Sequence, residues 1–179
     1  MRTLVLGMGN ELLSDDAVGL KVVRELEQAI SHPDVEVRET CLASLELLDL
    51  LAGFDRAILI DAIKTGAGKP GDIYILSPDD FGDGSAPASL HHVDLPTVLA
   101  AGRSLGAKMP EDVRIFAVEA KDTSTFGGEC CPAVQAAVPR VIRLIRAELG
   151  RTRVTHSDAR RAVETTATST QSRPSPTRS

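Results

Sequence analysis

The sequence predicts an α/β fold: a three-layer α/β/α sandwich around a mostly parallel twisted sheet, in a single domain. Short apolar runs typical of buried strands alternate with longer segments whose apolar residues recur at helical spacing. Because parallel strands need a crossover between them, usually a helix, this β-α-β-α-β order predicts helices on both faces of the sheet. The length of 179 residues fits one such domain.

The strands are expected at residues 3–7, 35–40, 57–61, 72–76 and 113–118. The first run ends at glycine, and the run at 57–61 is almost continuously apolar, as strands buried on both faces are. The run at 35–40 alternates apolar and polar residues, which predicts a strand near the edge of the sheet.

The helices are expected at residues 18–30, 45–51, 95–105 and 132–149. In the first of them, apolar side chains recur on one side and charged side chains on the other. Ser14 is the expected N-cap, and Asp15 and Asp16 would lie in the first turn, where the helix dipole favours negative charge. Pro139 lies inside the last helix, so we expect either a kink there or a helix that begins at this residue.

The last part of the chain differs in composition from the rest. Residues 151–179 are rich in Thr, Ser, Arg and Pro and have too few apolar residues to offset the entropy cost of ordering. Six arginines against two carboxylates give this segment a net charge of +4, so residues 1–150 must carry −9 for the total to be −5. We predict a folded domain over residues 1–150 and a disordered basic tail over residues 151–179.

The composition excludes several classes of function. A net charge of −5, a single Tyr and no Trp argue against a nucleic-acid partner. No apolar stretch approaches the roughly 20 residues of a membrane span, so no membrane partner is expected. Three cysteines, two of them adjacent, form a poor disulfide framework, which predicts a location in the reducing cytoplasm. We expect a monomer.

Carboxylates follow four of the expected strands. The first strand leads to Asp16, the second ends at Glu39, the third ends at Asp61, and the strand at 113–118 is followed by Glu119. In an open parallel sheet, ligands bind at the carboxyl ends of the strands, so these side chains are candidates for one site. Taken singly, each could be an ordinary polar residue at a strand end. Asp61 directly follows four apolar residues, which makes it the strongest functional candidate.

The segment from Gly7 to Asp16 lies between the first strand and the first helix, where a dinucleotide loop would lie. Its Gly7-x-Gly9 pattern fits such a loop, but Leu12 stands where the third glycine is expected. Asp15 and Asp16 would occupy the helix N-terminus that a pyrophosphate needs. Because two carboxylates repel an anion and attract a cation, the segment predicts a metal-binding site instead.

Two histidines, His91 and His92, precede the helix at 95–105. Histidines in such a position are more often ordinary surface residues than ligands. Carboxylates and a neutral imidazole are nevertheless suitable ligands for Ni²⁺ or Zn²⁺. If Asp16, Asp61 and one of the histidines converge, three protein ligands would leave coordination positions open for a substrate.

The candidate nucleophiles are weaker. Cys130 and Cys131 lack the two-residue separation of a redox or zinc pair, and Cys41 has no sign of a partner base. No Gly-x-Ser-x-Gly elbow occurs in the chain. The sequence therefore assigns no nucleophile.

Three motifs occur in a fixed order along the chain. The segment from Leu4 to Gly19 reads as a strand, then Gly-x-Gly-Asn, an apolar pair, two acidic residues and a later glycine. Further on come Ile60-Asp61-Ala62 and the segment Ser89-x-His91-x-x-x-Leu95. Together they resemble the opening, the second acidic site and the histidine segment of the nickel–iron hydrogenase maturation proteases. The resemblance covers about residues 1–149.

This resemblance implies a function. Members of the family are similar α/β/α single domains that remove the C-terminal extension from the precursor of a [NiFe] hydrogenase large subunit after nickel has been inserted. The family's metal ligands map onto Asp16, Asp61 and His91, and Asp16 and Asp61 would be the catalytic carboxylates. Nickel would be carried by the precursor and bound only transiently by the enzyme. The family is sometimes grouped with the aspartic peptidases, although nothing in the sequence shows an Asp dyad that shares a proton.

Two other functions stay open at this point. A nucleotide-binding or accessory module without hydrolytic activity would bind a dinucleotide and would shorten no precursor. A metal-dependent peptidase of related fold would cut peptides that are unrelated to hydrogenase.

Overall fold

The computed structural model describes residues 1–41, 46–81, 95–127 and 129–151. The chain divides into two compact units, Met1–Ile145 and Arg146–Ser179. In the described part of the second unit, Glu148 forms an ion pair with Arg151. The predicted basic tail lies outside the described residues except for Arg151, so its disorder and the boundary of the domain stay predictions.

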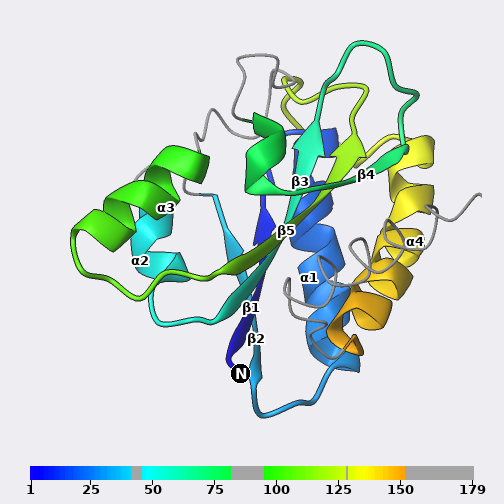
Figure 1. The fold of residues 1–179 in the computed structure, drawn as a ribbon. Coiled ribbons are helices and arrows are strands. Elements are labelled where there is room, and N and C mark those ends of the chain that lie inside the picture. Colours follow the sequence, from blue (N-terminus) through cyan, green and yellow to red (C-terminus); the bar gives the residue numbers. More distant parts are fainter. Residues whose placement is uncertain (42–45, 82–94, 128, 152–179) are drawn as a thin grey trace, which may run out of the picture. The chain divides into compact units, whose positions relative to one another are not determined.

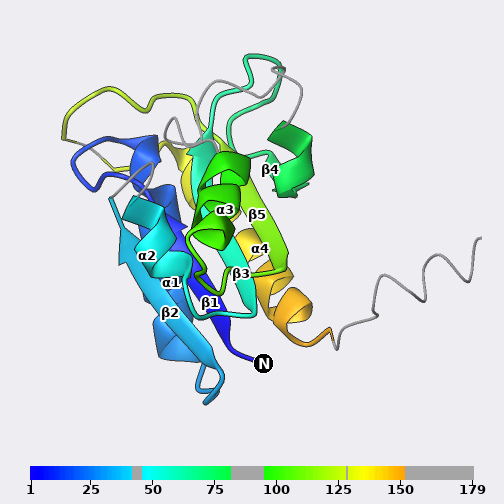
Figure 2. The same cartoon turned by 60° about the vertical axis from the view of Figure 1, so that its left-hand side comes forward.

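A five-stranded sheet forms the centre of the first unit. Its strands are β1 (Thr3–Met8), β2 (Val35–Thr40), β3 (Arg56–Ile63), β4 (Ile73–Leu76) and β5 (Asp112–Glu119). They lie in the order β2-β1-β3-β5-β4, and only β4 is antiparallel to its neighbour (Figure 2). The prediction of a mostly parallel sheet is therefore confirmed, and all five expected strands are present.

Helices cover both faces of this sheet. The helices are α1 (Val18–Ala29), α2 (Leu47–Leu51), α3 (Leu95–Ser104) and α4 (Pro132–Leu149). Figure 1 shows α1 on the same face as the part of α4 that belongs to the first unit, and α2 with α3 on the other face. This arrangement confirms the three-layer α/β/α fold class. Among the described residues, no helix is long and apolar enough to cross a membrane.

Pro139 lies inside α4, so the expectation that it marks the start of the helix is wrong. Proline lacks the N–H that would bond to the preceding turn, which weakens the helix at this point. The buried side chains of Val138 and Val141 flank the proline and fix the helix by packing. Tertiary packing therefore overrides the local preference of proline.

The hydrophobic core on the side of α2 and α3 is formed by alternate residues of the strands. Leu4 and Leu6 of β1 pack there with Leu59 and Ile63 of β3. The core is completed by residues of the two helices and of β5, which include Leu47, Leu51, Leu95, Leu99 and Ile115. Because side chains alternate between the faces of a strand, the residues of β3 that share this face are the odd-numbered ones.

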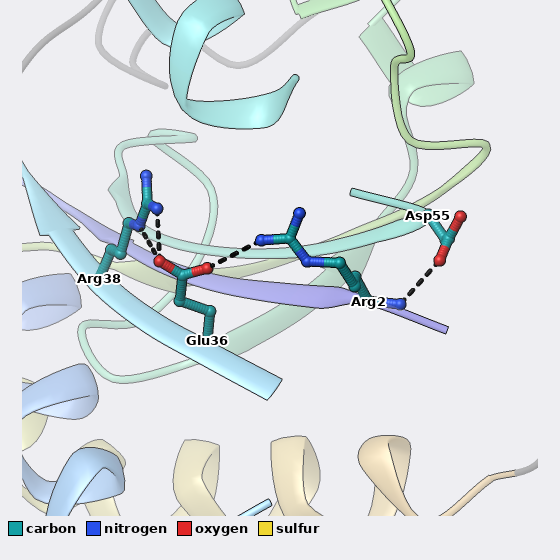
Figure 3. A network of polar contacts seen from close by, with 4 residues as sticks. All are labelled: Arg2, Glu36, Arg38 and Asp55. Carbon is teal, nitrogen blue, oxygen red and sulfur yellow. Dashed lines mark hydrogen bonds and ion pairs between the residues drawn. The ribbon is translucent and has the colours of Figure 1, made fainter. Parts of the chain in front are cut away.

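A polar network ties the strands together at the amino end of the sheet (Figure 3). The backbone N–H of Arg2 donates to Asp55 at 2.7 Å, and the Arg2 guanidinium pairs with Glu36. Glu36 also pairs with Arg38. The Arg2 guanidinium lies 4.7 Å from the centroid of the Phe54 ring. This network lies at the opposite end of the sheet from the carboxyl ends of the parallel strands, so we assign it to the fold rather than to the site.

Gly19 in the first turn of α1 lets this helix pack directly on the strands. A Cβ atom at this position would lie 2.2 Å from the carbonyl oxygen of Met8 and 2.5 Å from that of Ile60. Both neighbours are backbone atoms of buried strands, so neither can move away easily. We expect Gly19→Ala to lower the free energy of unfolding by about 1–3 kcal/mol, measured by urea denaturation.

Gly150→Ala is the control for this substitution, because a Cβ atom there meets nothing closer than 3.6 Å. Its free energy of unfolding should stay close to that of the wild type. Equal stabilities for the Gly19 variant and the wild type would show that the helix can shift away from the sheet without cost.

Candidate active site

The carboxyl ends of β1 and β3 mark the point where the connections of the sheet change direction. The helix that follows β1 leads outward to β2, whereas the next crossover returns past β1 to β3. The pairing of β1 with β3 ends at Gly7 and Ile60, while β3 continues beside β5 as far as Ile63. In open α/β sheets, such a switch point is where ligands bind.

Asp61 lies on the part of β3 that extends beyond its pairing with β1. The prediction that the third strand ends at Asp61 is wrong, because β3 continues through Ala62 to Ile63. Ile63 is fully buried in the core, and this burial extends the strand. The Asp61 side chain is also fully buried, and its Oδ1 atom accepts the N–H of Ala62 at 2.7 Å. By strand alternation it lies on the same face as Leu59 and Ile63, toward α2 and α3.

Asp16 approaches the same edge of the sheet from the end of β1. It belongs to η1, a short 3-10 helix over Asp15–Ala17 that leads into α1 and contacts β3. Its side chain is buried, and its Oδ2 atom accepts the backbone N–H of Asn10 at 2.8 Å. Two buried carboxylates, Asp16 and Asp61, are thus positioned by neighbouring strands at the switch point.

The turn between β1 and η1 needs its glycines. Gly9 has a φ of +147°, and a Cβ atom there would lie 2.1 Å from the carbonyl oxygen of Asp16. A Cβ atom at Gly7 would lie 2.3 Å from the carbonyl oxygen of Gly19. The Asn10 side chain adds to the turn, because its Oδ1 atom accepts the N–H of Leu12. The two glycines and Asn10 therefore shape the turn.

This turn is unsuited to a phosphate group. A dinucleotide loop offers free backbone N–H groups to the diphosphate, but here the N–H of Gly9 donates to Thr40 and that of Asn10 to Asp16. The N–H of Ser14 donates to the carbonyl oxygen of Thr125. Since these donors are already used, and a carboxylate lies among them, the geometry disfavours the nucleotide-binding alternative.

Asp15, the neighbour of Asp16, holds a different part of the chain. Its side chain is fully buried and accepts three backbone N–H groups, from Lys121 at 2.8 Å, Asp122 at 3.0 Å and Cys131 at 2.6 Å. Asp15 therefore fixes the segment between β5 and α4 against the turn that leads to Asp16. This role could not be inferred from the sequence, because the segment that Asp15 holds is more than a hundred residues away in the chain.

The prediction that Ser14 caps the first helix is wrong, because its side chain makes no capping hydrogen bond. Its hydroxyl instead donates to the carbonyl oxygen of Glu129 at 3.4 Å. Ser14 thus adds a contact to the same segment that Asp15 holds.

Two of the four strand-end carboxylates have other partners. Glu39 is exposed and pairs with Arg24 of α1, with Nε and Oε2 2.7 Å apart. Arg24 also pairs with Glu11, and its hydrogen bond lowers the pKa of Glu11. Glu119 is buried and accepts the N–H and the hydroxyl of Thr65. These contacts indicate that Glu39 and Glu119 stabilise the fold.

His91, the third expected metal ligand, lies outside the described residues, and so does His92. Across residues 1–41, 46–81, 95–127 and 129–151, no group of three or more His, Cys, Asp or Glu side chains could hold a metal ion. The three-residue ligand set of Asp16, Asp61 and His91 therefore stays a prediction.

All three cysteines are free thiols. Cys130 is buried, its Sγ atom lies 3.4 Å from the carbonyl oxygen of Ser14, and burial raises its pKa. A raised pKa keeps the group as a thiol at neutral pH, and a thiol is a poor nucleophile. This agrees with the view that Cys130 is not the attacking group.

Asp122 closes the turn after β5 and should make this turn sensitive to acid. Hydrogen bonds from Thr125 and Ser124 lower the pKa of its carboxyl group. Because the pKa is lower in the folded state than in the unfolded state, the stabilisation is complete above about pH 4 and is lost as the pH falls further. We expect the melting temperature of Asp122→Asn, which cannot titrate, to fall less than that of the wild type between about pH 6 and pH 3. If the melting temperatures of the two proteins fell equally across this pH range, the role of Asp122 would be contradicted.

Comparison with known proteins identifies the family. The family model described as "Hydrogenase maturation protease" matches residues 20–148. The hydrogenase 2 maturation protease of Escherichia coli K12 is 34% identical over 154 residues, which cover 83% of this chain and 91% of that protein. The chain therefore belongs to the hydrogenase maturation proteases. It is thus a hydrolase, an endopeptidase that acts in hydrogenase maturation.

Solved structures of maturation proteases have the same fold. The hydrogenase maturating endopeptidase HybD from E. coli matches with a TM-score of 0.71 and 33% identity, covering 83% of this chain and 92% of that chain. The [NiFe] hydrogenase maturation protease HybD from Thermococcus kodakarensis matches with a TM-score of 0.64 and 27% identity. The match covers 84% of this chain and 100% of that chain. The family model match begins after Asp16 and includes both Asp61 and His91.

Proposed function

We propose that this maturation protease removes the C-terminal extension from the precursor of a [NiFe] hydrogenase large subunit after nickel has been inserted. Membership of the family is the observation that carries the proposal. The related protein from T. kodakarensis is itself described as a [NiFe] hydrogenase maturation protease, which supports the same class of substrate here.

In this proposal nickel arrives as part of the substrate and is recognised by Asp16, Asp61 and His91. The position of the two buried carboxylates at the switch point between β1 and β3 supports their roles. Two carboxylates and an imidazole suit a divalent ion such as Ni²⁺. Three protein ligands would leave positions open for groups of the precursor.

The proposed chemistry is hydrolysis of one peptide bond near the bound nickel. The ion is suited to polarise the carbonyl group or to activate water, and Asp16 or Asp61 is suited to accept the proton of the water. A dyad of Asp15 and Asp16 is disfavoured, because Asp15 already accepts three backbone N–H groups from the segment between β5 and α4. We place the reaction in the cytoplasm, in line with the free thiols, and take the enzyme to be a monomer.

The test compares nickel-loaded and nickel-free precursor, with mass spectrometry to detect loss of the C-terminal extension. We expect a single cut in the loaded precursor and none in the nickel-free one. Equal cutting of both forms would contradict recognition of nickel. Cutting of peptides unrelated to hydrogenase would favour a peptidase with another substrate.

A further inference from the structure

Two large apolar side chains are exposed close to the candidate active site. Phe126 is 76% exposed and Leu12 is 62% exposed, whereas Phe54 and Phe116 are buried. Single exposed apolar residues are common on protein surfaces and need no explanation. These two differ because they lie on hydrogen-bonded segments that come from distant parts of the sequence.

The two segments form a short antiparallel pair. Leu13 and Phe126 are directly opposite each other, and the N–H of Gly127 donates to the carbonyl oxygen of Leu12 at 2.9 Å. Residues opposite each other in an antiparallel pair point to the same face. Leu13, which is half-buried, therefore lies on the same face as the Phe126 side chain, whereas Leu12 is the preceding residue in the turn and is exposed.

This pair is anchored on both sides. Asp15 holds the backbone of Lys121, Asp122 and Cys131, as described above. Asp122 in turn accepts the N–H groups of Ser124 and Thr125. The Phe126 backbone is thus held in place while its ring stays in solvent, an arrangement that contributes little to folding and limits the entropy cost of binding.

The same backbone segment connects the pair to the site, because Leu12 precedes Asp16 by one short turn. An endopeptidase has to hold residues of its substrate beside the bond that it cuts. We propose that Leu12 and Phe126 dock an apolar stretch of the precursor polypeptide next to that bond. This inference rests on the proposed function and adds the contact surface for the substrate.

The negative charge of the protein indicates which residues flank the docked stretch. Residues 1–150 carry a net charge of −9, and Glu129 beside the second segment is exposed, whereas Glu11 on the first segment is paired with Arg24. An acidic surface attracts basic segments and repels acidic ones. The occupant is therefore an apolar stretch of the precursor with basic rather than acidic neighbours.

The experiment measures the affinity of the full chain for nickel-loaded precursor, together with KM and kcat for its processing. Phe126→Ser should raise both Kd and KM about tenfold to hundredfold without changing kcat, the effect of losing one buried aromatic contact. Leu12→Ser should act in the same direction, and Phe126→Tyr, which keeps the ring, should remain close to the wild type. The control is Leu105→Ser, because Leu105 is 77% exposed but follows the end of α3.

Unchanged Kd and KM in Phe126→Ser would overturn the inference, and so would an equal loss in Leu105→Ser. A wild-type enzyme that binds the precursor but does not shorten it would contradict the proposed function. In that case the Kd values of the same variants still decide whether Leu12 and Phe126 form the docking surface.

Discussion

Asp16→Asn should strongly impair processing of the nickel-loaded precursor while the protein stays folded. The amide is nearly isosteric with the carboxylate and keeps an oxygen to accept the N–H of Asn10, a bond of 2.8 Å in the wild type. The substitution removes the negative charge that a divalent cation needs from its ligand. We expect kcat/KM to fall by about 10²–10⁴-fold or more, in a cleavage assay on the loaded precursor.

Glu39→Gln provides the matched control for this prediction. Glu39 also lies near the carboxyl end of a strand, but it is exposed and pairs with Arg24. Losing an exposed ion pair changes stability by about 0–1 kcal/mol, so its kcat/KM should stay close to that of the wild type. Full activity in Asp16→Asn would remove Asp16 from the site, whereas equal losses in both variants would point to a general effect of charge on substrate binding.

The fold could be predicted because its signals are local. The run at 57–61 is apolar enough to indicate a buried strand. The helical spacing of apolar residues over 18–30 identifies the buried face of that helix, even when the elements that pack against it are unknown. The exact end of β3 could not be predicted in this way. It depends on pairing with β5 and on the burial of Ile63, both of which come from distant parts of the chain.

The candidate site shows the same limit. The order of glycines and carboxylates from Gly7 to Asp16 is enough to predict a turn that favours a cation, and the structure places Asp61 at the neighbouring strand. The role of Asp15 could not be predicted, because its partners follow β5 and precede α4. Likewise, the pairing of Glu39 with Arg24 needs α1 and β2 to lie side by side.

Asp15→Ala should be among the most destabilising single substitutions in this protein. It removes both oxygens that accept the N–H groups of Lys121, Asp122 and Cys131, and it leaves these donors without partners. A hydrogen bond to a charged group contributes about 1.5–3 kcal/mol. Because these three bonds are partly buried and the loop can relax in part, we expect a loss of about 3–5 kcal/mol in the free energy of unfolding. Urea denaturation measures the total, and hydrogen exchange at these three amides should locate the change.

Asp15→Asn separates this role from catalysis. One oxygen of the amide can still accept the N–H groups of Lys121 and Asp122, which share Oδ2 in the wild type, but the amide nitrogen would then face the N–H of Cys131. This variant should be destabilised less than Asp15→Ala. Below its melting temperature it should keep most of its activity. Wild-type stability with no activity would instead make Asp15 a partner of Asp16 in the reaction. If Asp15 variants lose stability and Asp16 variants lose activity, the two neighbouring carboxylates have separate roles, in line with their different hydrogen-bond partners.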